Sequence, residues 1–248
     1  MTLEGKTAVV TGGGRDIGRA IALALAERGA RIIVSYHASA DGAQAVVQDI
    51  ASRGGVAKAV HSNLTTQQGV NALVDAANAL GGCVDILVNN AGGLVARKTM
   101  EQMDLNHWNA VMDLNLTSTF MVTKACLPLM SKGATIINLS SLAGRDGGGP
   151  GAIAYATAKG AIMTMTRGLA KELGPDIRVN ALCPGMINTG FHDAFTSDTA
   201  RKNVAAATPL KREGMAQEIG ETVAFLASPA SGFINGACID TNGGVAFS

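Results

Sequence analysis

Short apolar stretches alternate with longer amphipathic segments along the whole chain, and this alternation restricts the fold more than any other feature. Residues 86–88 and 136–137 are continuously apolar, as strands buried on both faces of a sheet are. On this basis we predict seven strands, at residues 7–11, 31–35, 56–61, 85–89, 135–140, 178–183 and 237–240.

The segments between these strands have the spacing of apolar residues that is typical of helices. They lie at residues 17–28, 41–53, 67–80, 105–131, 155–173 and 216–227. Each is long enough to connect two parallel strands, so the alternation predicts a doubly wound α/β fold with helices on both faces of a parallel sheet. Ligands of such sheets bind beyond the carboxyl ends of the strands, where the strand order reverses, and functional residues are expected there.

The composition excludes several classes of partner. The 248 residues fit one α/β domain, and the net charge of +1 comes without a run of basic residues, so we expect a small-molecule substrate and neither nucleic acid nor a membrane. The first residues lack the features of a signal peptide, which predicts a cytoplasmic location. The four cysteines are widely spaced, which favours reduced thiols over disulfides. The four histidines form no cluster with metal-ligand spacing, so we expect no metal.

Tyr155 and Lys159 stand four residues apart on one predicted helix, so their side chains share a face. A free phenol has a pKa of about 10, and an adjacent cation favours the phenolate. We therefore expect the pKa of Tyr155 to be lowered toward the range in which a phenol can exchange a proton at pH 7. Taken alone the pair is weak evidence, because a half-buried tyrosine beside a solvated lysine gives the same pattern.

The first predicted strand ends in a glycine-rich turn that leads directly into a helix. The turn reads Thr11-Gly12-Gly13-Gly14-Arg15-Asp16-Ile17-Gly18. Glycines at such a turn let the backbone approach a pyrophosphate, and the helix N-terminus favours its negative charge. An ordinary tight turn can also use glycines, but the position after the first strand favours phosphate binding.

Further motifs end the other strands: Asn89-Asn90-Ala91-Gly92, Ser140-Ser141 and Pro184-Gly185, with Asn115 in the long helix between the first two. Together with the glycine-rich turn and the Tyr155–Lys159 pair, they occur in the order typical of one family, the short-chain dehydrogenase/reductases. The chain resembles that family over essentially its whole length. The resemblance implies a single Rossmann-type domain over residues 1–248 and reversible hydride transfer between a nicotinamide and a carbonyl or secondary alcohol carbon.

The resemblance also implies a role for each catalytic candidate. Tyr155 would protonate the developing alkoxide during reduction, and Ser141 would donate a hydrogen bond to the same oxygen. Lys159 would hold the nicotinamide ribose and keep the phenol acidic, while Asn115 would position Lys159 through water. Two simpler readings stay open, with Ser141 as the cap of a strand end and Asn115 as an amide on the helix surface. Ser140 is a less favoured candidate for the role of Ser141.

The residues that the resemblance places around the dinucleotide come from the ends of several strands. They are Gly12, Gly14, Arg15, Ile17, Gly18, Tyr36, Asn63, Leu64, Asn89, Ala91, Gly92, Tyr155, Lys159, Pro184, Gly185, Ile187 and Thr189.

The end of the second strand bears on the choice between NADP(H) and NAD(H). An NAD site usually has a carboxylate there, which accepts hydrogen bonds from the ribose hydroxyls. Here that end reads Ser35-Tyr36-His37, and the first acid, Asp41, is expected to start a helix. Because Arg15 can attract a 2′-phosphate, we expect NADP(H) to be preferred, with NAD(H) as the alternative.

Two departures from the family pattern affect the site. Asp16 stands where the family usually has glycine, and we expect its carboxylate to cap the following helix, with Arg15 and Arg19 compensating its charge. Ser141 and Tyr155 are fourteen positions apart, one more than in the family pattern. The glycine cluster at residues 147–151 can absorb the extra residue.

The sequence leaves the substrate open. The expected pocket walls, residues 93–96, 145–154 and 186–195, mix apolar side chains with Arg145 and His192. Residues 186–212 lack a regular pattern and are expected to form a mobile substrate loop. The leading hypothesis is a 3-oxoacyl thioester reductase, followed by a sugar or polyol dehydrogenase, and a dinucleotide-binding regulator without turnover is the third. The mean hydropathy of +0.23 and the long helices rich in Ala, Met and Gly predict a homo-oligomer, and the family resemblance implies a homotetramer.

Overall fold

The apolar segments form one parallel sheet at the centre of the molecule, as predicted. The computed structural model describes residues 2–247, apart from the side chain of Ala194. The sheet has seven strands in the order β3-β2-β1-β4-β5-β6-β9. They are β1 (Thr7–Val10), β2 (Arg31–Tyr36), β3 (Ala57–His61), β4 (Ile86–Asn89), β5 (Thr135–Leu139), β6 (Arg178–Pro184) and β9 (Cys238–Thr241).

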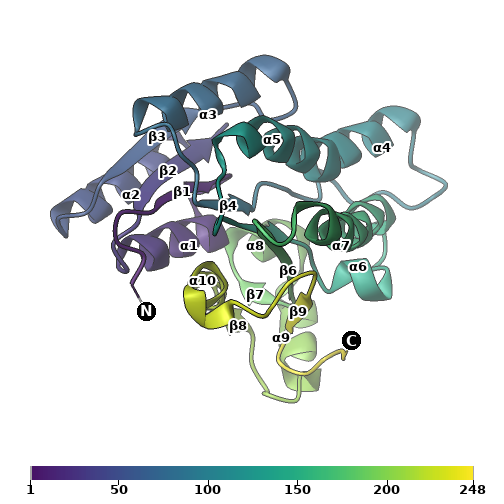
Figure 1. Cartoon of the computed structure of the whole chain (residues 1–248). Coiled ribbons are helices and arrows are strands. Elements are labelled where there is room, and N and C mark those ends of the chain that lie inside the picture. The colour runs from purple at the N-terminus through teal and green to yellow at the C-terminus, as the bar shows by residue number, and fades with distance from the viewer. Residues whose placement is uncertain (1, 248) are drawn as a thin grey trace.

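Helices cover both faces of this sheet (Figure 1). One face carries α1 (Asp16–Ala26), α2 (Ala40–Ser52) and α10 (Ala216–Ala227), and the other carries α3 (Gln67–Ala79), α5 (Ser118–Cys126) and α7 (Ile153–Leu173). In β1, Ala8 and Val10 pack into the first layer and Val9 into the second, all three fully buried. Because alternate side chains enter opposite cores, the strands read as continuous apolar runs.

The strand order reverses between β1 and β4, which lie side by side at the middle of the sheet. The Thr11 hydroxyl accepts hydrogen bonds from the backbone N–H groups of Asn90 (2.9 Å) and Ala91 (3.0 Å). The Asn90 side-chain amide in turn donates to the carbonyl oxygens of Thr11 (2.9 Å) and Gly12 (3.1 Å). These bonds join the glycine-rich turn to the end of β4, where a doubly wound sheet binds its ligand.

The long helix predicted over residues 105–131 is interrupted. It consists of α4 (Leu105–Met112), a π-helical turn (Asp113–Thr117), α5 and a 3₁₀ turn (Leu127–Leu129). A short helix, α6 (Ala143–Asp146), and a 3₁₀ turn (Pro229–Ser231) were not predicted. The glycine cluster at residues 147–151 lies outside regular structure between α6 and α7, as expected.

The prediction of an irregular loop at residues 186–212 is wrong. This segment contains β7 (Ile187–Asn188), α8 (Gly190–Phe195) and α9 (Asp198–Ala207), and β7 pairs with β8 (Gly214–Met215). The Arg201 guanidinium of α9 bonds both carboxylate oxygens of Glu213 at 2.7 Å and the Asn188 side chain at 2.8 Å. Such short elements depend on tertiary contacts that sequence periodicity does not reveal.

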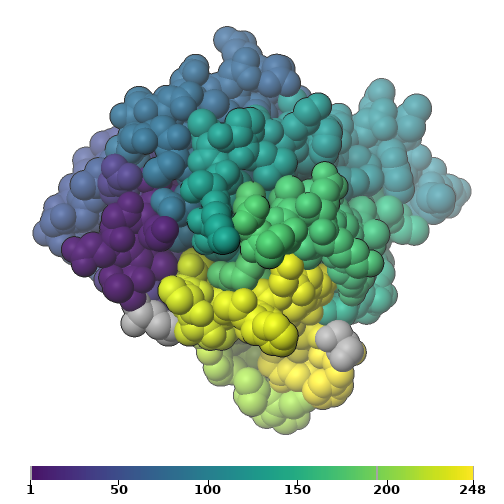
Figure 2. Space-filling view, viewed as in Figure 1, coloured from purple at the N-terminus to yellow at the C-terminus, as the bar shows by residue number. Residues whose placement is uncertain are grey.

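The C-terminal residues complete the molecular surface beside the strand ends. In Figure 2 they appear in yellow, between the purple N-terminal segment and the green segment that includes α7. Within residues 2–247, no helix combines the length and the apolar character needed to cross a bilayer.

Candidate active site

A cavity of about 1090 Å³ opens at the carboxyl ends of the strands. Its size is at the upper end of the range for ligand sites. All the predicted site residues line it except Asn89 and Asn115. The glycine-rich turn therefore shares one cavity with Ser141, Tyr155 and Lys159, which come from a distant part of the chain.

The glycine-rich turn has the close backbone packing that a dinucleotide site requires. Gly12 has a φ of +62°, in the left-handed region that favours glycine. A Cβ atom on Gly18 would lie 2.2 Å from the Gly12 carbonyl oxygen and 2.6 Å from the Asn90 side-chain nitrogen. Helix α1 can therefore begin against the turn only with glycine at this position. The glycine backbone that lines the cavity and the helix N-terminus fit a bound pyrophosphate.

Asp16 does not cap helix α1, contrary to expectation. Its φ of 51° lies in the left-handed region that favours glycine. The Asp16 carboxylate accepts a hydrogen bond from the backbone N–H of Gly190, at 3.0 Å. Arg15 lies 3.8 Å from it, whereas Arg19 pairs with Asp49 instead. The carboxylate thus joins the glycine-rich turn to the start of α8.

Lys159 and the two serines are held by different contacts. The Lys159 side chain is only 4% exposed, and its ammonium donates to the Leu139 carbonyl oxygen at 2.6 Å. Its nitrogen lies 5.7 Å from the centroid of the Tyr155 ring. The Ser140 hydroxyl donates to the Lys159 carbonyl oxygen at 2.7 Å and so serves packing. The Ser141 hydroxyl oxygen accepts from the Ala143 N–H at 3.1 Å, and the same hydroxyl lowers the pKa of Tyr155.

The expected lowering of the pKa of Tyr155 is wrong in this structure. Burial raises the pKa of the phenol, and the hydrogen bond with Ser141 lowers it by a smaller amount. Burial also lowers the pKa of Lys159 to about 8. At pH 7 the phenol is therefore neutral and the ammonium is charged, which is the state in which Tyr155 can donate a proton.

Asn115 lies behind the cavity wall, in the π-helical turn between α4 and α5, and it is fully buried. Its side-chain oxygen accepts from the Gly93 N–H at 3.0 Å, and its nitrogen donates to the Gly93 carbonyl oxygen at 2.8 Å. A Cβ on Gly92 would lie 2.6 Å from the Asn115 oxygen and 3.1 Å from the Lys159 nitrogen. Asn115 and Lys159 therefore approach the same glycine, and the helix-surface alternative is excluded.

Asn89 was predicted to contact the cofactor, but its side chain points away from the cavity. Its side-chain nitrogen donates to the Thr123 hydroxyl (3.0 Å) and to the Asn138 side-chain oxygen (2.9 Å), inside the layer that contains α5. The side chain is 3% exposed and does not line the cavity. Its neighbour Asn90, which we did not predict, lines the cavity instead. Side chains alternate along a strand, so only one of two adjacent asparagines could face that side.

The substrate end of the cavity has an aromatic wall with polar groups at its rim. The ring centroids of Phe191 and Tyr155 are 6.0 Å apart, and those of Phe191 and Phe195 are 5.2 Å apart. Arg97, which we also did not predict, donates from Nε to the Phe195 carbonyl oxygen (2.9 Å) and from Nη1 to that of Pro150 (2.8 Å). Across residues 2–247 no group of three His, Cys, Asp or Glu side chains could hold a metal ion.

One end of the cavity lies beyond β2. Arg15, Tyr36 and His37 line it, and Asp41 lies in the first turn of α2, outside the cavity wall, as expected. The His37 ring stacks on that of His61, with centroids 5.6 Å apart. No carboxylate therefore stands at the end of β2.

A sheet of this topology with a glycine-rich turn after its first strand defines a dinucleotide-binding oxidoreductase fold. Residues 12–246 match the family described as enoyl-(acyl carrier protein) reductase. A 3-oxoacyl-[acyl-carrier-protein] reductase from Synechocystis sp. is 39% identical over 98% of both chains. A Brucella melitensis structure described as a short-chain dehydrogenase/reductase, glucose/ribitol dehydrogenase, is 32% identical, with a TM-score of 0.94 over 100% of both chains. A blue fluorescent protein from a metagenomic library, in complex with NADPH, is 35% identical, with a TM-score of 0.93 and the same coverage.

The chain belongs to the short-chain dehydrogenase/reductase family, as its motifs indicated. It is an oxidoreductase of the kind that binds a nicotinamide dinucleotide, and the glycine-rich turn and the cavity fit such a ligand.

Replacing Asp16 by glycine is expected to leave the affinity for the reduced dinucleotide unchanged or to increase it. Glycine adopts the positive φ without strain, and the change removes a negative charge from the turn that a pyrophosphate approaches. The measurement is a titration that follows cofactor fluorescence, with Asp16→Asn as the control that removes only the charge. A loss of affinity of about tenfold, or 1.4 kcal/mol, would contradict this expectation.

The affinity for the dinucleotide is also expected to fall as the pH rises through about 8, because Lys159 then loses its charge. The sign follows from burial, which lowers the pKa of Lys159 and so places this loss at a lower pH than for an exposed lysine. The same titration over a pH series measures it. Lys159→Met should bind more weakly at every pH and lack the fall near pH 8; a fall of equal size in that variant would assign it to another group.

Proposed function

We propose that the protein is an NADP(H)-dependent reductase of 3-oxoacyl thioesters. The observation that supports this most is one cavity at the strand ends that is lined by Ser141, Tyr155 and Lys159 together with the glycine-rich turn. Gly12, Gly14 and Gly18 would cradle the pyrophosphate, and Pro184, Gly185, Ile187 and Thr189 would flank the nicotinamide.

The proposed reaction reduces a ketone to a secondary alcohol. A nicotinamide bound in this cavity would supply the hydride to the carbonyl carbon, and Tyr155 would give its proton to the carbonyl oxygen. Ser141 donates a hydrogen bond to that oxygen as negative charge develops on it. The raised pKa of Tyr155 keeps the phenol protonated and favours reduction at neutral pH. Lys159 binds the ribose hydroxyls, and Asn115, which fixes the loop at Gly93, supports the position of Lys159.

The substrate class rests on the relatives and on the pocket wall. A relative that is 39% identical is named a 3-oxoacyl-[acyl-carrier-protein] reductase. The aromatic wall formed by Phe191 and Phe195 suits an acyl chain better than a polyhydroxylated one. A sugar or polyol dehydrogenase is the second candidate, because a solved structure of the same fold carries a glucose/ribitol dehydrogenase description.

Tyr155→Phe is expected to lower kcat by about 10²- to 10⁴-fold, the usual contribution of a general acid, and to leave dinucleotide affinity unchanged. The assay follows NADPH oxidation with acetoacetyl thioesters and, in the opposite direction, NADP⁺ reduction with a panel of polyols. Turnover of polyols alone would favour the second candidate. Full activity in Tyr155→Phe would remove this residue from the mechanism, and a wild-type protein that binds NADPH without turning over any of these compounds would be a regulator.

NADPH is expected to bind at least about tenfold more tightly than NADH, since a charge-assisted hydrogen bond to the 2′-phosphate is worth about 1.5–3 kcal/mol. Arg15 lines the cavity with a side chain that is 71% exposed, and no carboxylate at the end of β2 would repel the phosphate. Arg15→Ala should reduce the preference. Arg19→Ala is the matched control, because Arg19 pairs with Asp49 outside the cavity. Tighter binding of NADH would overturn this assignment.

We also propose that the protein is a homotetramer. Large apolar side chains are exposed on and near α4 and α5, among them Leu105 at 71% and Phe120 at 51%, and Phe233 is fully exposed near the C-terminus. Apolar side chains gathered on helices are typical of surfaces that become buried between subunits. Light scattering should give four times the mass of one chain, and a monomer would contradict the proposal.

A further inference from the structure

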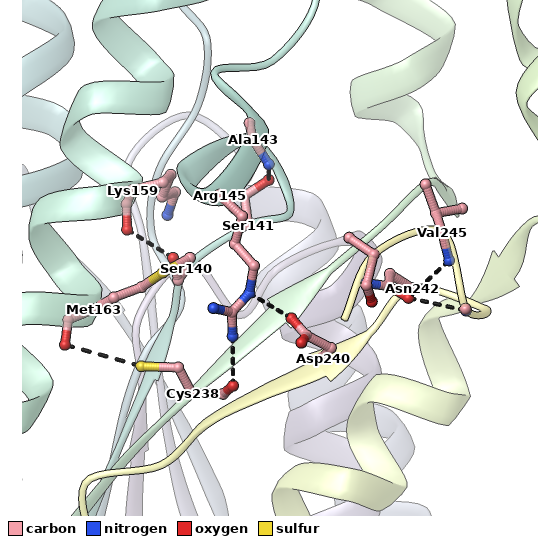
Figure 3. Close-up of polar contacts among 12 residues, drawn as sticks. Ser140, Ser141, Ala143, Arg145, Lys159, Met163, Cys238, Asp240, Asn242 and Val245 are labelled. Atoms are coloured by element: carbon pink, nitrogen blue, oxygen red, sulfur yellow. Dashed lines mark hydrogen bonds and ion pairs between the residues drawn. The ribbon is translucent and has the colours of Figure 1, made fainter. Parts of the chain in front are cut away.

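We propose that Arg145 and Asp240 position Ser141 for catalysis by holding the short helix α6 against strand β9. The inference rests on the proposed function, in which Ser141 acts on the substrate oxygen. Arg145 was expected on the pocket wall, but its side chain does not line the cavity. It extends from α6 toward Asp240 on β9, as Figure 3 shows.

The contact between α6 and β9 is a partly buried ion pair, and the same guanidinium makes a second hydrogen bond to β9. Arg145 Nε donates to the Asp240 carboxylate at 2.6 Å, and Arg145 Nη2 donates to the Cys238 carbonyl oxygen at 2.7 Å (Figure 3). The two charged side chains are only 16% and 14% exposed. A charged pair at this depth is favourable only while both partners keep their hydrogen bonds, so the pair fixes the distance between its two elements.

Helix α6 needs such an anchor because it has only four residues, too few to be stable alone. Its backbone packs directly on α7: a Cβ on Gly144 would lie 2.8 Å from the backbone nitrogen of Gly160. The Leu142 N–H donates to the Pro184 carbonyl oxygen at 2.8 Å. The Arg145–Asp240 pair adds a side-chain anchor to these backbone contacts.

The anchor reaches Ser141 through one hydrogen bond, which the Ala143 N–H at the start of α6 donates to the Ser141 hydroxyl oxygen at 3.1 Å. Ser141 lines the same cavity as Tyr155, and its hydroxyl lowers the pKa of that phenol. A shift of α6 would therefore turn the Ser141 hydroxyl away from Tyr155. Asp240 and Arg145 thus act through Ser141, and neither touches the reacting atoms.

The chain offers a direct readout, because Tyr36 and Tyr155 are its only tyrosines. In a Tyr36→Phe background, the ultraviolet absorbance of the phenolate follows the ionisation of Tyr155 alone, without substrate or dinucleotide. Ser141→Ala should raise the pKa of Tyr155, since it removes the hydrogen bond that lowers this pKa. If the pair positions Ser141, then Arg145→Met and Asp240→Asn should each raise the pKa of Tyr155 as well.

The sign of these shifts separates positioning from direct electrostatics. Tyr155 also faces Lys159 from α7 and, across Phe191, His192 from α8, while Arg145 faces Cys183 on β6 and Cys238 and Asp240 on β9. If Arg145 and Asp240 acted only through their charges, then loss of the cation would raise the pKa of Tyr155, and loss of the anion would lower it. Shifts in opposite directions would therefore overturn the proposal.

A double-mutant cycle completes the test. In a Ser141→Ala background, Arg145→Met and Asp240→Asn should produce no further shift, and a shift of the same size there would contradict a route through Ser141. Arg28→Met is the matched control, because Arg28 pairs with Glu221 at 2.5 Å between α1 and α10, and it should leave the pKa of Tyr155 unchanged. Should Arg145→Met fail to fold, as judged by circular dichroism, the isosteric Asp240→Asn carries the test alone.

A kinetic test uses the acetoacetyl thioester or polyol that the wild-type protein turns over fastest. Arg145→Met and Asp240→Asn should each lower kcat by roughly tenfold and leave dinucleotide affinity unchanged. A misplaced hydrogen-bond donor stabilises the transition state less but does not alter cofactor binding. Unchanged kcat in both variants would overturn the proposal. Because the phenolate titration needs no substrate, its outcome stands even if 3-oxoacyl thioesters are not turned over.

Discussion

The buried ammonium of Lys159 is the interaction on which the arrangement of the site depends. A charge that is only 4% exposed must be met by polar partners, and the Leu139 carbonyl oxygen at the end of β5 is one of them. This bond fixes the position of helix α7 along strand β5. The Ser140 hydroxyl, which bonds the Lys159 carbonyl oxygen, closes a second link between the same two elements. Tyr155, one helical turn earlier, is thereby held next to Ser141.

Desolvation also sets the acid–base character of the site. Desolvation acts in opposite directions on the two groups, because it disfavours the phenolate of Tyr155 and also the ammonium of Lys159. A neutral phenol beside a lysine whose pKa is about 8 is suited to giving a proton to an alkoxide. In the proposed mechanism, this protonation state suits the reducing direction near neutral pH.

The sequence predicted the parts of the fold that depend on local patterns. Continuous apolar runs such as residues 86–88 identify strands buried on both faces, and glycines placed after the first strand identify the dinucleotide turn. The assembly of Ser141, Tyr155 and Lys159 in one cavity also followed, because parallel strands end at one edge of the sheet. The order of these motifs indicated the family, and the comparisons with known proteins confirmed it.

What the sequence missed depends on contacts between distant residues. The pKa of Tyr155 could not be predicted from its spacing to Lys159, because burial is a property of the folded chain. Asp16 bonds Gly190, and Arg201 holds a segment that has no periodic pattern, so neither contact could be inferred from neighbouring residues. The same holds for the Arg145–Asp240 pair, whose partners lie 95 positions apart.

A crystal structure of the protein with NADPH would show directly how the dinucleotide lies in the cavity. We predict that its pyrophosphate lies against the turn at Gly12, its nicotinamide ribose at Lys159, and its nicotinamide ring opposite the Tyr155 hydroxyl. A dinucleotide bound outside this cavity, or bound with its adenine end at Tyr155, would contradict this prediction.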